Sequence, residues 1–118
     1  MNSLSGKSIL ILEDENLLRK KLSNYLNRLG ADVFESANIL SAKDFLKNQR
    51  FDVCLFDINL PDGNSLDLLK SNIINSETIV IVMTSDPSMQ TAIDALKFGA
   101  KDYLTKPFES AQSLLAIQ

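Results

Sequence analysis

Short apolar runs alternate along the chain with stretches in which apolar residues recur every three or four positions. Runs of the first kind predict β-strands, and recurrence of the second kind predicts amphipathic helices. The predicted strands cover residues 8–12, 32–36, 53–56, 78–83 and 102–105. The third and fourth of these strands are apolar on both faces, so we expect them at the centre of a parallel sheet that helices cover on both sides.

One helix is predicted after each strand. The predicted helices cover residues 17–29, 41–48, 66–73, 86–98 and 110–117. Gly30 suits the left-handed residue that commonly ends a helix. Ser41 is expected to cap the second helix, while Asp86 as cap and Pro87 at the first helical position predict the start of the fourth.

Five strand–helix units in succession predict an α/β domain built on a doubly wound parallel sheet. The chain has 118 residues, of which 45% are hydrophobic, and this length and composition suit one domain over residues 1–118. The last predicted helix is short and the chain stops inside it. We therefore expect a piece cut within or near the fifth helix from a longer protein.

Composition excludes several classes of function. The net charge is −3 and the basic residues cluster only at Arg19-Lys20-Lys21, which gives no electrostatic footprint for nucleic acid. The absence of histidine excludes Ser/His and Cys/His catalysis and His-ligated metals. Cys54 is the one cysteine, so no intrachain disulfide is possible and a buried apolar role is expected. No apolar stretch is long enough to cross a membrane, and a cytoplasmic location is expected.

Polar and charged residues follow the ends of four predicted strands. Glu13 and Asp14 follow the first strand, and Asp57 follows the third within "LFDINLPDG". Thr84 follows the fourth strand and Lys106 the fifth. Ligands of open parallel sheets bind beyond the carboxyl ends of the strands, so these residues meet in one crevice if the first and third strands are neighbours.

Three clustered carboxylates call for a cation, because each pair at 4 Å repels by roughly 1 kcal/mol in water and about 4 kcal/mol at an effective dielectric constant of 20. Oxygen ligands select a hard ion, with Mg²⁺ first and Mn²⁺ or Ca²⁺ as alternatives. An acid cluster beside Lys106 and Thr84 indicates phosphoryl chemistry, with Asp57 as nucleophile. Each residue alone would suit a helix cap, a turn or the surface. Their joint placement favours a site.

The chain resembles the response-regulator receiver domain of two-component signalling from about Lys7 to its end. The resemblance depends on the stretches "ILILEDE", "VCLFDINLPDGNSLDLL", "IVIVMTSDPSM" and "AIDALKFGAKDYLTKPF". It is strongest to receivers of NtrC-type transcriptional activators. It implies the flavodoxin-like or CheY-like strand order 2-1-3-4-5, counted along the chain.

The resemblance also implies roles for the acids. Asp57 matches the phosphorylated aspartate. Asp14 matches the acid that binds Mg²⁺ directly, and Glu13 matches the one that acts mostly through water. Asn59 matches the position whose backbone carbonyl completes the metal site. The family often has Asp-Asp where this chain has Glu13-Asp14.

Three further residues match the family's switch. Thr84 matches the hydroxyl that moves to hold the phosphoryl group, and Lys106 matches the lysine that pairs with it. Tyr103 matches the aromatic residue that rotates inward when the threonine moves. The resemblance also implies a cis peptide bond between Lys106 and Pro107.

The function implied is that of a signalling receiver rather than an ordinary enzyme. Asp57 takes a phosphoryl group from the phosphohistidine of a cognate histidine kinase, and the domain promotes its own phosphorylation and dephosphorylation. The surface of the fourth helix, fifth strand and fifth helix then forms a homodimer or contacts an output domain, which is absent from this chain and is expected to regulate transcription. No direct contact with nucleic acid or membrane is implied.

Three alternatives come from other classes. Haloacid-dehalogenase-type phosphatases also use an Asp nucleophile with Mg²⁺, but their nucleophile follows the first strand and is followed two residues later by an Asp, where this chain has Asn59. A receiver-like module could also bind partners without phosphorylation. A flavin carrier shares the fold, but the acidic loop "EDEN" is hostile to a flavin phosphate.

Overall fold

The computed structural model describes residues 3–85 and 88–118. Within them, the secondary structure consists of β1 (Ser8–Leu12), α1 (Asn16–Arg28), β2 (Asp32–Ser36), α2 (Ile39–Asn48), β3 (Val53–Asp57), β4 (Asn59–Leu60), β5 (Gly63–Asn64), α3 (Leu66–Lys70), β6 (Ile79–Thr84), α4 (Met89–Lys97), β7 (Asp102–Thr105) and α5 (Ser110–Ile117). None of the helices described is both long enough and apolar enough to traverse a lipid bilayer.

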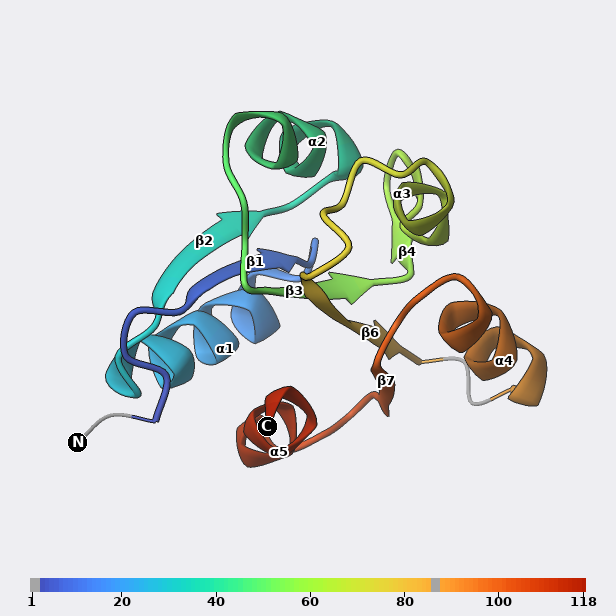
Figure 1. Ribbon diagram of the computed structural model, residues 1–118. Helices are drawn as coiled ribbons and strands as arrows, with labels where there is room; N and C mark the ends of the chain where they lie inside the picture. Colours follow the sequence, from blue (N-terminus) through green and yellow to red (C-terminus); the bar gives the residue numbers. More distant parts are fainter. Residues whose placement is uncertain (1–2, 86–87) are drawn as a thin grey trace.

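Five of the strands form a parallel sheet in the order β2-β1-β3-β6-β7 (Figure 1). Counted along the chain, this is the predicted order 2-1-3-4-5. Ile9 of β1 pairs with Val33 of β2 on one side and with Val53 of β3 on the other. The chain thus winds outward in one direction to β2 and then in the other direction to β7, and the change of direction falls between β1 and β3.

The sheet has a hydrophobic core on each face, because successive residues of a strand point to opposite sides. Leu10, Cys54 and Val82 belong to the core packed by α2, α3 and α4, whereas Ile9 and Leu55 belong to the one packed by α1 and α5. Figure 1 shows α1 and α5 on the opposite side of the sheet from α2 and α3. Cys54 is fully buried, as predicted, and burial raises the pKa of its thiol.

The predicted start of the second helix is wrong. The helix begins at Ile39 rather than at Ser41, and the cap is Asn38, whose side-chain oxygen accepts a hydrogen bond of 2.8 Å from the Ser41 amide. A capping side chain must precede the amide that it satisfies by two or three residues. Ser41 lies inside the first turn and therefore donates to the cap.

Two other helices differ from the predicted ranges. The third ends at Lys70, and Ile73 packs against the core from the loop that follows. The fourth begins at Met89, where the hydroxyl oxygen of Ser88 caps it by accepting from the Thr91 amide at 3.2 Å. The predicted cap Asp86 and first residue Pro87 lie outside the described residues.

A two-stranded hairpin follows β3 directly and was not predicted. Asn59–Leu60 pairs with Gly63–Asn64, and a turn at Pro61 and Asp62 joins the two strands. The hairpin lies close to α2, since a Cβ atom at Gly63 would lie 3.1 Å from the side chain of Ile39.

Asp62 attaches this hairpin to the N-terminus of α2. Its carboxylate accepts hydrogen bonds from the amides of Ile39, at 2.8 Å, and Leu40, at 3.0 Å. The bond from Ile39, supported by that from Leu40, holds the pKa of Asp62 below its usual value. The carboxylate thus satisfies two amides that a helix start leaves unpaired.

The Asp62→Ala variant should melt at a lower temperature than the wild type at neutral pH. Because the folded-state pKa of Asp62 is lowered, its contribution to stability is present above about pH 3.8, the usual pKa of an aspartate. This contribution is lost as the pH falls through the folded-state pKa. The difference in melting temperature should therefore shrink in strong acid. Thermal unfolding followed by circular dichroism at a series of pH values measures it. Asp44→Ala, an exposed aspartate on α2, is the matched control, and an equal loss of stability there would contradict the capping role.

Candidate functional site

Three carboxylates meet at the carboxyl ends of β1 and β3, as predicted. The pairing of Leu12 with Phe56 sets the two strand ends side by side. One oxygen from each of Glu13, Asp14 and Asp57 lies within 4.8 Å of the others. Glu13 is fully buried, Asp57 is 7% exposed and Asp14 is exposed, so the cluster runs from the interior to the surface.

Lys106 reaches this cluster from the end of β7. Its Nζ lies 2.5 Å from Oε1 of Glu13 and 3.2 Å from Oδ2 of Asp57. Its backbone amide donates to the carbonyl of Thr84 at 2.7 Å, which ties the end of β7 to the end of β6. The peptide bond between Lys106 and Pro107 is cis, as the resemblance implied.

The pKa values of the site show a buried acid that is hard to ionise and a lysine that is held in its charged form. Burial raises the pKa of Glu13 to about 7, although Lys106 and the Glu15 amide oppose the shift, and the charge of Asp57 adds to it. Burial lowers the pKa of Lys106, but the hydrogen bond and charge of Glu13, with those of Asp57, outweigh it and leave the value raised. One ammonium group is therefore shared between two acids, Glu13 and Asp57. A divalent cation with a preference for oxygen ligands fits this donor set.

The other three predicted residues, Thr84, Asn59 and Tyr103, lie on three different strands around the cluster. Thr84 is the last residue of β6 and is buried, next to the strand that ends in Asp57. Asn59 begins the hairpin two residues beyond Asp57. Tyr103 lies on β7, pairs with Val82 and is 39% exposed, so this structure leaves its ring at the surface.

Arg19 is a residue of the site that the sequence did not reveal. It belongs to the basic run Arg19-Lys20-Lys21, yet its side chain is only 13% exposed. Its guanidinium donates to the backbone carbonyl of Glu13 at 2.7 Å and pairs with Glu35 at 3.2 Å. Its place on the first turn of the helix that follows the acids was the available signal, because the side chain of such a residue points back toward the strand end.

Ser65 is the second such residue. It is fully buried, and its hydroxyl donates to the backbone carbonyl of Asp57 at 2.5 Å. In the sequence, a serine that follows a turn and precedes a helix suggests a helix cap. No feature of the sequence distinguishes such a cap from a serine whose hydroxyl binds the end of a strand.

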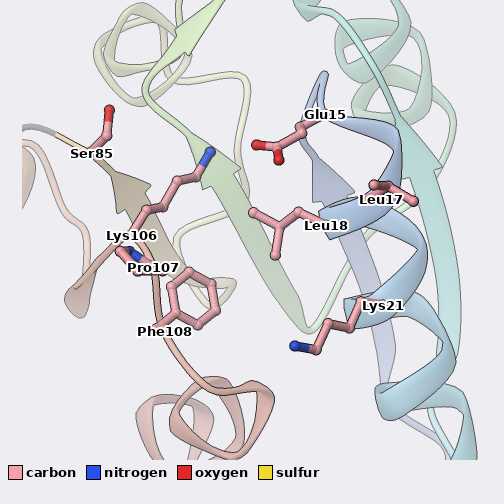
Figure 2. Close-up of a pocket in the computed structure, with 8 residues that line it drawn as sticks. All are labelled: Glu15, Leu17, Leu18, Lys21, Ser85, Lys106, Pro107 and Phe108. Carbon is pink, nitrogen blue, oxygen red and sulfur yellow. The ribbon is translucent and has the colours of Figure 1, made fainter.

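A cavity of about 540 Å³ opens beside Lys106, between α1 and the segment that follows β7 (Figure 2). Leu18 and Phe108 form apolar walls on its two sides, with Lys21 near one end and Glu15 near the other. The Lys106 side chain extends along the cavity toward the acidic end. A group brought in through this opening would arrive beside Lys106, whose ammonium contacts Glu13 and Asp57.

Comparison with protein families identifies the chain. The model of the response regulator receiver domain matches residues 9–118, so the chain belongs to the receiver domains of two-component response regulators. The response regulator protein PilR of Pseudomonas aeruginosa is 39% identical over 107 residues, which cover 90% of this chain and 24% of PilR. The DNA-binding transcriptional regulator NtrC of Azospirillum brasilense is 29% identical over 98% of the chain and 24% of NtrC, in agreement with the NtrC-type resemblance. The chain thus spans about a quarter of these relatives.

Solved structures support the same assignment. A response regulator from Burkholderia pseudomallei, solved with a phosphorylated aspartic acid, calcium ion and citrate, matches with a TM-score of 0.88 at 27% identity, over 95% of this chain and 66% of that one. The receiver domain of the sensor histidine kinase PA1611 of Pseudomonas aeruginosa, solved with magnesium ion in its active site cleft, matches with a TM-score of 0.82 at 26% identity, over 97% and 96% of the two chains.

In the absence of metal ions, the stability of the wild type should fall relative to Glu13→Gln as the pH rises. The pKa of Glu13 is about 7 in the folded protein, against 4.5 for the free side chain. The contribution of Glu13 to the stability of the fold is therefore complete below its unfolded-state pKa. It is lost as the pH rises through its folded-state pKa. Melting temperatures in EDTA across this range measure the difference. Glu77→Gln, an exposed glutamate beside the start of β6, is the matched control, and the same trend in that variant would contradict the assignment to Glu13.

Proposed function

We propose that the chain is a Mg²⁺-dependent phosphoacceptor that takes a phosphoryl group from a histidine kinase onto Asp57. The observation that carries the proposal is the position of the Asp57 carboxylate, which lies within 4.8 Å of two other acids and 3.2 Å from the Lys106 ammonium. The phosphorylated aspartic acid of the Burkholderia response regulator supports the same chemistry in a structural neighbour.

The phosphoryl transfer requires one bond to form and one to break. A carboxylate oxygen of Asp57 attacks the phosphorus of the kinase's phosphohistidine in line with the P–N bond. The P–O bond forms as the P–N bond breaks, and the electron pair of the P–N bond goes to the ring nitrogen. With a proton on its other nitrogen, the ring leaves as neutral imidazole. This chain contains no histidine, so the kinase supplies the one that the step needs.

Lys106 and Thr84 hold the negative charge that spreads over the phosphoryl oxygens. The ammonium of Lys106 exchanges its contact with Asp57 for one with the phosphoryl group, and the Thr84 hydroxyl donates to another oxygen. Glu13, Asp14, Asp57 and the carbonyl of Asn59 would hold Mg²⁺, which neutralises phosphoryl oxygens when bound. Hydrolysis of the acyl phosphate returns Asp57 to its free state.

The output follows from a population shift of Thr84 and Tyr103. The phosphoryl group favours the state in which Thr84 has moved toward it and Tyr103 has turned inward. The face of α4, β7 and α5 carries exposed Ile93, Leu96 and Leu115 beside Tyr103, which suits a surface for a second copy or an output domain. We propose a cytoplasmic regulator in which this domain controls a transcriptional output domain outside the present chain.

Incubation with Mg²⁺ and phosphoramidate should add a single phosphoryl group to the wild type and none to Asp57→Ala. The acyl phosphate requires the Asp57 carboxylate, and EDTA should prevent its formation. Intact-mass spectrometry measures the adduct. Asp32→Ala, an exposed acid at the opposite edge of the sheet, should be phosphorylated like the wild type. A stable adduct on Asp57→Ala, or none on the wild type, would overturn the proposal.

Phosphorylation should change the environment of Tyr103 and leave that of Tyr25 unchanged. The chain has two tyrosines, so ¹⁹F-labelled tyrosine gives one signal from β7 and one reference signal from α1. The Thr84→Ala variant should still be phosphorylated, but the Tyr103 signal should not shift, because the hydroxyl that couples them is gone. An equal shift in that variant would show that the two residues are not coupled.

A further inference from the structure

Ser65 has a contact that its place in the chain does not explain. It occupies the N-cap position of α3, yet its side chain makes no capping hydrogen bond. The Asn64 side chain instead accepts from the Leu66 amide at 2.8 Å. The hydroxyl of Ser65 is directed at the backbone carbonyl of Asp57, 2.5 Å away and eight residues back along the chain.

The Asp57 carbonyl belongs to the peptide group between Asp57 and Ile58, and the amide of this group is bound to the sheet. The amide of that group, from Ile58, donates to Met83 of β6 at 3.1 Å. In a trans peptide the carbonyl points away from the amide, so the Asp57 carbonyl faces away from β6, at a point where β1 has already ended at Leu12. A buried carbonyl needs a hydrogen-bond donor, and Ser65 provides one.

Ser65 also holds the next peptide group. Its backbone amide donates to the carbonyl of Ile58 at 2.8 Å. One residue therefore binds both peptide groups that link Asp57 to Asn59. The first of these groups fixes the backbone from which the Asp57 carboxylate extends, and the second leads into the residue whose carbonyl is proposed to face the metal.

We propose that Ser65 is a positioning residue for the phosphoacceptor, and that its hydroxyl fixes the backbone of residues 57–59 in the geometry that binds Mg²⁺ and accepts the phosphoryl group. This proposal rests on the function proposed above for Asp57. Ser65 is fully buried with helical backbone angles, so an alanine can occupy its place and removes the hydroxyl alone.

The test compares Ser65→Ala with Ser113→Ala. Ser113 is also fully buried, and its hydroxyl also donates to a backbone carbonyl at 2.5 Å, that of Ser110, but it lies on α5. The two variants therefore lose the same kind of bond at different places. The measurements are Mg²⁺ affinity by calorimetry, initial phosphorylation rate with phosphoramidate, melting temperature, and amide hydrogen exchange of the metal-free protein.

Ser65→Ala should bind Mg²⁺ about 10-fold more weakly, the usual scale for loss of a group that orients a ligand. It should also be phosphorylated more slowly, and the amides of Ile58 and Ser65 should exchange faster without metal. Ser113→Ala should keep the wild-type Mg²⁺ affinity, phosphorylation rate and exchange rates, even if its melting temperature falls as much as that of Ser65→Ala. Equal Mg²⁺ affinity and equal exchange in the two variants would overturn the proposal.

Ser65→Cys keeps the test decisive if the alanine variant does not fold. Its thiol is similar in size but a weaker donor, so Mg²⁺ affinity below that of the wild type is expected, and wild-type affinity would contradict the role of the hydroxyl. The wild type separates the two proposals. If it neither binds Mg²⁺ nor accepts a phosphoryl group, the proposed function fails. If it does both and Ser65→Ala does so equally well, only the role of Ser65 fails.

Discussion

The repulsion among carboxylates at one edge of the sheet is the constraint on which the rest of the structure depends. Glu13 and Asp57 are buried there beside Asp14, and the ammonium of Lys106 is shared between the two buried acids. Burial of Glu13, to which the charge of Asp57 adds, raises its pKa to about 7, so keeping this acid ionised costs stability in the metal-free protein. The same cluster of acids prepares the site for a divalent cation. Because a phosphoryl group is itself negative, an acceptor built on acids needs positive charge around it before it can react.

A repelling cluster stays in place only if its backbone is held from outside the cluster. Arg19 holds the carbonyl of Glu13, and Ser65 holds the carbonyl of Asp57. Asp62 in turn fastens the hairpin after Asp57 to the start of α2. These polar contacts come from three different elements, so the geometry of the acids reflects the packing of helices around the edge of the sheet. The hydrogen bond from the Lys106 amide to the Thr84 carbonyl also joins the ends of β7 and β6 beside the cluster.

The sheet and the meeting of its acids could be predicted from the sequence because each has a strong local signal. Apolar runs mark the strands, and parallel order brings their carboxyl ends together, so Asp57 and Lys106 were identifiable before any coordinates. Caps and side-chain contacts with the backbone could not be predicted in the same way. The hydroxyl of Ser65 and the carboxylate of Asp62 act on partners chosen by tertiary packing. The exposure of Tyr103 likewise depends on how the helices pack around β7, which a sequence pattern does not record.

Locating the phosphoryl group by chemical trapping tests the central claim most directly. Borohydride reduces an acyl phosphate to an alcohol, so a phosphorylated aspartate becomes homoserine, which tandem mass spectrometry of peptides can assign to a position. After treatment with Mg²⁺ and phosphoramidate, the account predicts homoserine at position 57 and unmodified acids at Glu13 and Asp14. Reduction at either of those acids, or none at position 57, would contradict the assignment of Asp57 as the acceptor.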